Sequence, residues 1–219
     1  MSEFYAGELH ERFRKSDYGR HLEEQTRFND FKPEWVGAEL WCDTLGDDVN
    51  NLRHMPYTKG LAWEFCAQNR ETKDTTRLLG LAAITHDWGE AVVGDIAMPS
   101  KTASDEDKEM VAWLDIAEDL LGIRGRELGA AVMPIIFGKG TELADRFRAI
   151  EYIGYTKTAL KARHQADMLS FGVKTIESTR TEKEQLIGGL LSLHRAVELH
   201  TIPTVAEYSK KYEGVRYMF

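Results

Sequence analysis

Apolar residues recur at spacings of three and four residues through most of the chain, and this periodicity restricts the possible fold more than any other feature. Alternating β-branched segments, which would indicate strands, are scarce. The pattern therefore predicts an all-α fold. The chain has 219 residues with five prolines and no clear linker, so we expect one helical domain over residues 1–219.

Prolines and capping residues indicate where individual helices begin and end. Pro33 and Pro56 each suit the first turn of a helix, which would leave His54 just ahead of the second one. Ser104 is expected to cap a helix that stops at Gly122. The other expected helices cover about 74–88, 141–164 and 181–199.

The charge balance and the cysteine content exclude several classes of protein. A formal net charge of -8 and a pI near 5.4 argue against a nucleic-acid binder, because such binding depends mainly on Lys and Arg that neutralise phosphates. Cys42 and Cys66 have no metal-pair spacing and are too few for a disulfide framework. The N-terminus lacks the layout of a signal peptide, and the apolar run 78–84 is too short to span a bilayer. We therefore expect a cytoplasmic protein without a membrane segment.

Four titratable residues follow the apolar run within ten positions, in the segment HDWGEAVVGD. On a helix, Glu90 lies four residues after His86 and three after Asp87, so the imidazole and the two carboxyl groups can share one pocket. Gly94 can form a turn that directs Asp95 back to the same place. The alternative is that Glu90 and Asp95 are solvated surface acids, because a His-Asp dipeptide alone is common.

Glu151 lies on an otherwise apolar stripe of the helix expected over 141–164. Leu143, Phe147, Glu151 and Tyr155 follow one another at spacings of four residues. A carboxylate on a buried face needs a cation, because an unpaired buried charge costs several kcal/mol. That cation is a metal ion or, alternatively, an Arg or Lys side chain.

These residues resemble the HD-domain metal phosphohydrolases, in which a first His, an adjacent His-Asp pair and a late Asp bind one divalent ion. Arg53-His54 resembles the first His, and His86-Asp87 resembles the pair that names the family. The motif-bearing region runs from about residue 53 to residue 151. The resemblance implies a helical bundle of the HD-domain type.

Within that family, the chain is most similar to the 5'-deoxynucleotidase-like branch. The branch uses a Glu three residues after the motif Asp and an Asp eight residues after it, and Glu90 and Asp95 have these spacings. It also tends to carry a Pro and a Lys shortly after the second acid, as Pro99 and Lys101 do here. The resemblance therefore implies that Glu90 and Asp95 are catalytic and that Lys101 binds substrate.

The chain departs from the pattern of the branch at two places. Glu151 stands where the family has its last metal-binding Asp, and Asp145, six residues upstream, is off the apolar stripe. The branch also presents an adjacent Arg-Trp pair to its substrate, whereas the segment upstream of His54 offers Leu40-Trp41 with no adjacent Arg. We therefore infer no substrate contact from that segment.

The resemblance implies the following division of roles. One divalent ion, which could be Mn, Co, Fe, Ni, Zn or Mg, would be bound by His54, His86, Asp87 and Glu151. Glu90 would orient or deprotonate a water molecule, and Asp95 would protonate the leaving oxygen. Lys101 would neutralise phosphate charge, or else it is a solvated loop lysine.

The expected substrate is a small phosphorylated metabolite, above all a 5'-(deoxy)nucleoside monophosphate, and relatives in the family are often homodimers. One alternative is a triphosphohydrolase or a phosphodiesterase with the same site. Another is a non-hydrolytic or oxidative protein on the same scaffold. Two irons would need additional His ligands close to His54 and His86, and the sequence has none nearby.

Overall fold

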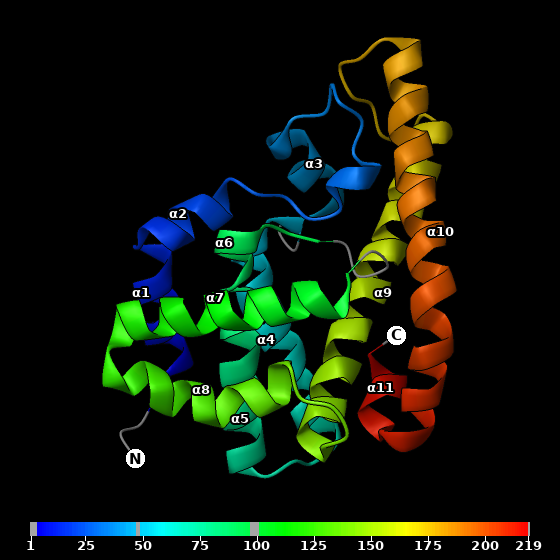
Figure 1. Cartoon of the computed structure of the whole chain (residues 1–219). Helices are drawn as coiled ribbons and strands as arrows, with labels where there is room; N and C mark the ends of the chain where they lie inside the picture. The colour runs from blue at the N-terminus through cyan, green and yellow to red at the C-terminus, as the bar shows by residue number, and fades with distance from the viewer. Residues whose placement is uncertain (1–3, 47–48, 97–100, 219) are drawn as a thin grey trace.

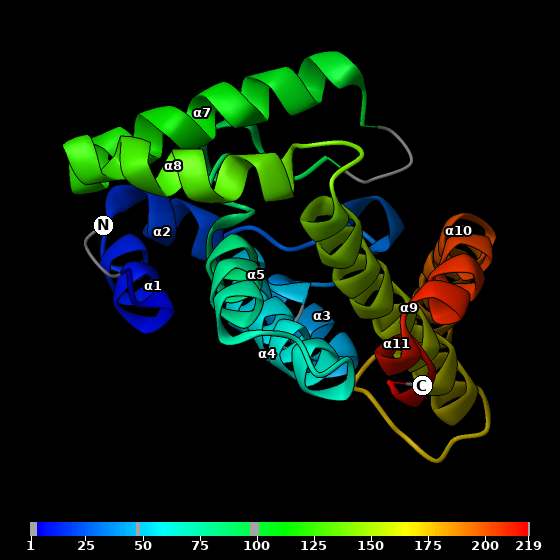
Figure 2. The same cartoon turned by 90° about the horizontal axis from the view of Figure 1, so that it is seen from below.

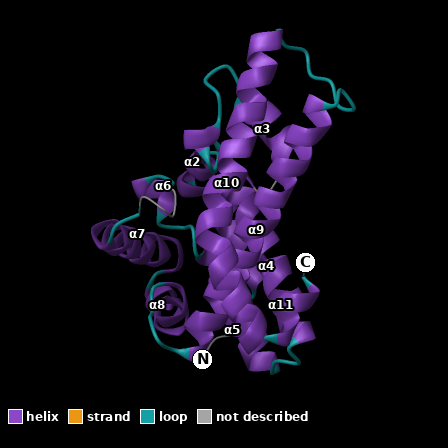
Figure 3. Ribbon diagram, turned by 90° about the vertical axis from the view of Figure 1, so that its right-hand side faces the viewer, coloured by secondary structure: helices purple, strands orange, loops and turns teal. Residues whose placement is uncertain are grey.

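The computed structural model describes residues 4–46, 49–96 and 101–218, and within these ranges it contains helices and no strands (Figure 3). The all-α prediction is confirmed. The helices are α1 (Ala6–Arg14), α2 (Asp17–Glu23), the short 3-10 helix η1 (Asn29–Phe31), α3 (Ala38–Leu45), α4 (Asn51–Gln68), α5 (Lys73–Thr85), α6 (Glu90–Val93), α7 (Ala103–Leu121), α8 (Ile123–Ile136), α9 (Glu142–Ser170), α10 (Arg180–Lys211) and α11 (Glu213–Tyr217).

The long helices are arranged as antiparallel pairs. Helices α9 and α10 run side by side along one edge of the molecule, with α11 against their lower end (Figure 1). Helices α4 and α5 form the central pair, and α7 and α8 lie across the opposite side (Figure 2). The short helix α6, which follows α5, lies against α2 and α7.

Two clusters of buried apolar side chains hold these helices together. The larger cluster joins α1, α2, α4, α5, α6, α7, α8, the first half of α9 and α11. Trp88 stacks between Phe13 and Trp113, with ring centroids 5.1 and 5.6 Å apart. The smaller cluster packs Trp41 of α3 against the second half of α9 and against α10. Trp88 thereby anchors the segment HDWGE in the larger core.

Helix α4 begins earlier than the proline pattern predicts. The side chain of Asn50 accepts a hydrogen bond from the backbone N–H of Arg53 (3.1 Å), so Asn50 is the N-cap. His54 consequently lies in the first turn of α4, and the prediction that it precedes the helix is wrong. Pro56 lies inside the helix, where its missing N–H removes one bond to the carbonyl of Leu52.

Two other helices begin at residues that differ from the predicted ones. Helix α3 begins at Ala38 and not near Pro33, because residues 33–36 form a turn closed by Val36 N–H and Pro33 C=O (2.9 Å). The N-cap of α7 is Thr102 and not Ser104, because Thr102 and Asp105 form a reciprocal capping box. The stop at Gly122 is confirmed.

Several helices are longer than expected or were not expected at all. Helices α9 and α10 continue well beyond the predicted ends near residues 164 and 199. Helices α1, α2, α8 and α11 were not predicted. Among the described helices, none combines the length and the apolar character that a bilayer-spanning segment requires.

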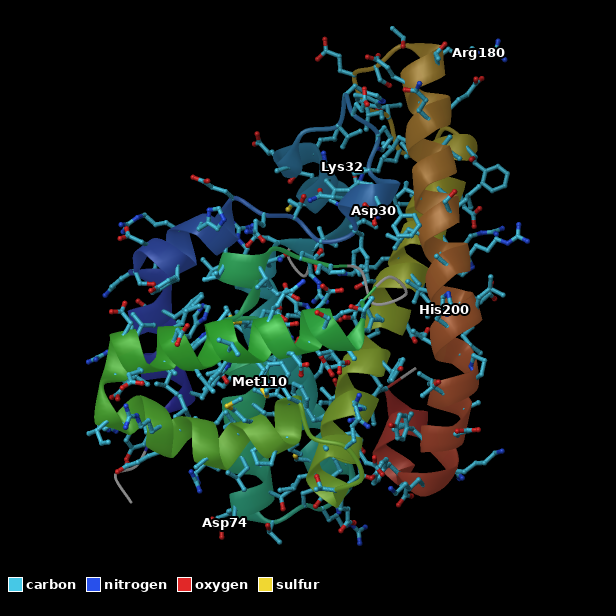
Figure 4. All side chains as sticks on the ribbon, in the orientation of Figure 1. Asp30, Lys32, Asp74, Met110, Arg180 and His200 are labelled. Carbon is cyan, nitrogen blue, oxygen red and sulfur yellow. The ribbon has the colours of Figure 1, made fainter. Side chains whose placement is uncertain are left out.

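Two adjacent glycines of α10 test how closely the loop around η1 packs on this helix. Asp30 and Lys32, which flank Phe31, lie beside α10 (Figure 4). A Cβ atom at Gly189 would collide with the backbone oxygen of Phe31, whereas a Cβ at Gly188 would meet nothing within 4 Å. We expect Gly189→Ala to lower the free energy of unfolding by about 1–3 kcal/mol. Gly188→Ala should raise it by roughly 0.5–1 kcal/mol, because alanine is the better helix former.

Urea unfolding of the two variants and the parent measures both changes. Equal effects of the two substitutions, in either direction, would contradict the close packing of the loop on α10.

Candidate functional site

The backbone at the end of α5 determines which nitrogen of His86 can act as a ligand. His86 is buried, and its Nδ1 lies 2.9 Å from the backbone oxygen of Ala83. A carbonyl oxygen only accepts hydrogen bonds, so Nδ1 carries the proton and Nε2 presents a lone pair when the ring is neutral. Burial lowers the pKa of His86 and so favours this neutral ring.

The lone pair of His86 faces a carboxylate oxygen at short range. His86 Nε2 lies 3.0 Å from Asp87 Oδ1, and both side chains are 5% exposed. Within the described residues, neither His86 Nε2 nor Asp87 Oδ2 forms a hydrogen bond. Two buried acceptors at this distance with no proton between them repel each other, unless a cation lies close to both. This is the first indication of a cation site.

His54 completes a compact group of potential metal ligands. It comes from the first turn of α4, is buried, and its ring centroid lies 5.2 Å from that of His86. Its Nε2 is 3.0 Å from the hydroxyl oxygen of Thr58. Ligand atoms of His54, His86 and Asp87 all lie within 4.8 Å of one another, and no other such group occurs in the described ranges. Two imidazoles and a carboxylate are a donor set that fits a divalent ion.

Glu151, the fourth predicted ligand, lies at the same pocket but outside this compact group. Burial, with a contribution from the nearby Asp87, raises the pKa of Glu151 to about 7. No Arg or Lys of the described residues forms an ion pair with it, so the alternative of a basic partner is not supported. Asp145, the other candidate, instead binds Lys211 at 2.6 Å.

The predicted catalytic acids lie close to the three potential metal ligands His54, His86 and Asp87. Glu90, the first residue of α6, is buried and accepts a hydrogen bond from the side-chain amide of Asn51 (3.1 Å). Burial, followed by the charges of Asp87 and Asp95, raises the pKa of Glu90 well above its usual value. Glu90 is therefore not a solvated surface acid.

Asp95 is half-buried and follows the turn predicted at Gly94, where φ is +84°. Burial raises the pKa of Asp95 most, the charge of Arg27 opposes this rise, and Asp87 adds to it. A raised pKa favours the protonated form of the carboxyl group. The turn at Gly94 thus brings a second acid close to Asp87.

Lys101 reaches the pocket, but it is already bound to another residue. Its ammonium group forms an ion pair with Glu109 of α7, whose side chain is 5% exposed. The interpretation of Lys101 as a solvated loop lysine is therefore wrong. Glu109 could not be recognised from the sequence, because nothing in the sequence of a charge-rich helix shows which of its acids is buried. Pro99, the neighbouring feature of the predicted motif, lies outside the described residues.

Arg27 was also missed, and it is the buried cation next to the acids. Its guanidinium group donates to the hydroxyl of Tyr155 (2.9 Å) and lies over the rings of Phe28 and Tyr155. Burial lowers the pKa of Arg27, but Tyr155 and the carboxylates around it outweigh this effect and raise it overall. Trp41 donates its indole N–H to the backbone oxygen of Arg27 (3.1 Å).

The fold thus brings an Arg and a Trp into contact although they are not adjacent in the sequence. A search for an Arg-Trp dipeptide passes over Arg27, because the residue that follows it is Phe28. The signal that could have found it is an arginine next to an aromatic residue upstream of His54.

The site opens into a cavity of about 200 Å³ between the 86–90 turn, α7, the end of α8 and α9. Tyr152, Tyr155, Ile96, Ile136 and Phe137 contribute ring or aliphatic surface to its wall. Its charged lining residues are Asp87, Glu90, Glu106, Glu109, Glu151, Lys101, Lys139 and Arg148. The cavity can therefore offer carboxylates for a cation and for proton transfer, and cationic side chains for an anion.

His194 belongs to a different part of the molecule. Its Nδ1 lies 3.2 Å from the backbone oxygen of Ala159, at the contact of α10 with α9.

Comparisons of the chain with known protein families, with curated proteins and with solved structures find no match. The function must therefore be argued from the site itself.

Gly89 tests how tightly the 86–90 turn is fitted against α7. A Cβ atom at Gly89 would collide with the backbone oxygen of Glu109 and lie 2.7 Å from its Cγ. We expect Gly89→Ala to lower the free energy of unfolding by about 1–3 kcal/mol, because the turn and α7 would have to separate.

Gly60→Ala is the matched control, since Gly60 is an exposed helical glycine with nothing within 4 Å of its ideal Cβ. Thermal unfolding of both variants measures the difference. A Gly89→Ala protein as stable as the Gly60→Ala protein would rule out the close contact.

Proposed function

We propose that the protein is a metal-dependent phosphohydrolase that removes phosphate from a small phosphorylated metabolite, most suitably a 5'-(deoxy)nucleoside monophosphate. One observation carries this proposal. His86 Nε2 and Asp87 Oδ1 are two buried acceptors 3.0 Å apart, with His54 beside them, in the wall of a cavity that also contains cationic side chains. Such a place suits both a divalent cation and the phosphate group that it would activate.

The residues that would hold the ion are His54, His86 and Asp87, with Glu151 as the fourth ligand. Nitrogen and carboxylate donors of this kind accept Mn, Co, Fe, Ni, Zn or Mg. When bound, such an ion lowers the pKa of a water molecule and offsets negative charge on a phosphoryl group. The Nδ1–H···O=C bond to Ala83 supports this role, since it keeps the ligand nitrogen of His86 deprotonated and the ring in one orientation.

Two acids would move the protons of the reaction. Glu90, held by the amide of Asn51, would orient the attacking water and accept its proton. Asp95, whose pKa is raised by burial, would donate a proton to the leaving oxygen. Lys101 would bind phosphate oxygens from the side of α7.

The charges in the cavity favour a monophosphate over a triphosphate. The lining contains five carboxyl side chains but only three cationic ones, and two of these cations, Lys101 and Lys139, are already paired with glutamates. A divalent ion would bring the wall close to neutrality. A monoester with about two negative charges can be accommodated there, whereas a triphosphate would lack cationic partners.

The cytoplasmic location of the protein and its assembly into a homodimer remain predictions.

Metal analysis tests the proposed ligand set. We expect protein purified without a chelator to contain one divalent ion per chain. His86→Ala should lose it, and Glu151→Asp should bind it more weakly while remaining folded, because the shorter side chain keeps the charge but loses reach. His200→Ala is the control, since His200 is an exposed residue of α10 (Figure 4).

Elemental analysis and a chelator competition provide the measurements. If Glu151→Asp and Glu151→Gln both retain the ion with parental affinity, Glu151 is not a ligand. If His86→Ala retains it, the proposed site is wrong altogether.

Substitution of the two proton carriers tests the mechanism. We expect Glu90→Gln and Asp95→Asn each to reduce turnover by about 10²–10⁴-fold, because a neutral amide can neither accept nor donate the proton. Metal content should stay close to that of the parent. Phosphate release is measured in a screen of nucleoside mono-, di- and triphosphates, with the exposed Glu118→Gln of α7 as the control.

A residual rate within a few-fold of the parent would remove the substituted residue from the mechanism. Loss of metal together with activity would instead make that residue a ligand or a support for one. Release of triphosphate or pyrophosphate would replace the monophosphatase by another hydrolase.

A further inference from the structure

The ion pair between Lys101 and Glu109 is the feature of the cavity that the proposed mechanism leaves unexplained. Both side chains line the cavity, and Lys101 is 23% exposed whereas Glu109 is 5% exposed. Burial of Glu109 raises the pKa of its carboxyl group, and the charge of Lys101 opposes this rise. A carboxylate is therefore kept at an unfavourable place in contact with a lysine.

Helix α7 holds Glu109 in a fixed relation to the metal-binding turn. Gly89 packs directly against the backbone of Glu109, where no larger residue fits. One turn later on the same face, Trp113 donates its indole N–H to the backbone oxygen of Thr85 (2.6 Å), the residue before His86. These two contacts tie the position of the Glu109 carboxylate to that of the His86–Asp87 pair.

Lys101 without Glu109 would have other carboxylates to bind. The charges of Glu90 and Asp87 already act on its ammonium group. A lysine side chain has a long flexible stem that lets its ammonium group take up different positions. A free Lys101 could therefore turn toward Glu90 or Asp87, where it would compete with the ion and with the water that Glu90 is proposed to orient.

We propose that Glu109 is a positioning residue that holds the ammonium group of Lys101 against the wall of α7, ready for the phosphate of the substrate and away from Glu90 and Asp87. This inference rests on the proposed function. An ammonium group has three N–H donors, so Lys101 can bind Glu109 and a phosphate oxygen at the same time. Glu109 itself touches neither the substrate nor the ion.

A double-mutant cycle separates this role from a purely structural one. We expect Glu109→Gln and Lys101→Met each to raise KM for the best monophosphate substrate by about 10-fold, the size of one charge-assisted hydrogen bond. If Glu109 acts through Lys101, the double variant should be no worse than Lys101→Met alone. Glu118→Gln is the matched control, because it removes another glutamate of α7 that pairs with an arginine (Arg126) at the surface.

A labelling experiment provides a measurement that does not depend on turnover. An acylating reagent modifies free amines, and mass spectrometry compares Lys101 with the exposed Lys73 in the same protein. The labelling rate of Lys101 is measured with and without inorganic phosphate, in the parent and in Glu109→Gln. Inorganic phosphate should protect Lys101 in the parent and protect it less in Glu109→Gln.

Two results would overturn the inference: equal protection of Lys101 by inorganic phosphate in the parent and in Glu109→Gln, or kinetic effects that multiply in the double variant. Multiplied effects would mean that Glu109 acts independently of Lys101. If the parent releases no phosphate from any monophosphate, the proposed function has failed. The protection of Lys101 by inorganic phosphate then still decides whether Glu109 positions Lys101 for an anion.

Discussion

Burial of His86 and Asp87 at the end of α5 is the constraint on which the rest of the site depends. Their facing acceptor atoms, 3.0 Å apart, are unfavourable unless positive charge lies nearby. The surrounding chain places the buried cation Arg27 close to the acids, and His54 forms with this pair a compact group of three donors that fits a divalent ion. Much of the neighbouring structure can be understood as the support that this small charged region requires.

The support comes from the aromatic core and from helix α7. Trp88 stacks between Phe13 and Trp113, so the residue after the His-Asp pair is fixed by the packing of three elements. Trp113 bonds the backbone of Thr85, and Gly89 lets α7 approach until Glu109 reaches the cavity. Because protein interiors are closely packed, these contacts leave the charged side chains little freedom to move. That rigidity suits the proton transfer proposed for Glu90 and Asp95, which would require a fixed geometry.

The residues of the site that are close together in the sequence could be predicted, whereas some of those that helix packing brings in could not. His86, Asp87, Glu90 and Asp95 occur within ten residues, so their closeness in the chain was sufficient to predict that they meet. The helix expected over 74–88 nevertheless ends at Thr85, and residues 86–89 form a turn. His54 was expected at the same place through a family resemblance, although its place inside α4 was not, because the cap at Asn50 precedes the proline. Glu109 gave no local sign, since the burial of a single charged residue is decided by the helices that cover it, and only the neighbouring Phe28 marked Arg27.

The sequence by itself determined the all-α class and the group of acids around the His-Asp pair, because the periodicity of apolar residues and the closeness of side chains within one short segment are local properties. The tertiary structure decided which distant residues complete the site. The approach of α4 brings His54 to His86, the approach of α7 turns Glu109 into the partner of Lys101, and the packing of α9 sets Tyr155 against Arg27. Those encounters depend on how the helices pack, and packing depends on the shapes of many side chains at once, which no spacing within one segment records.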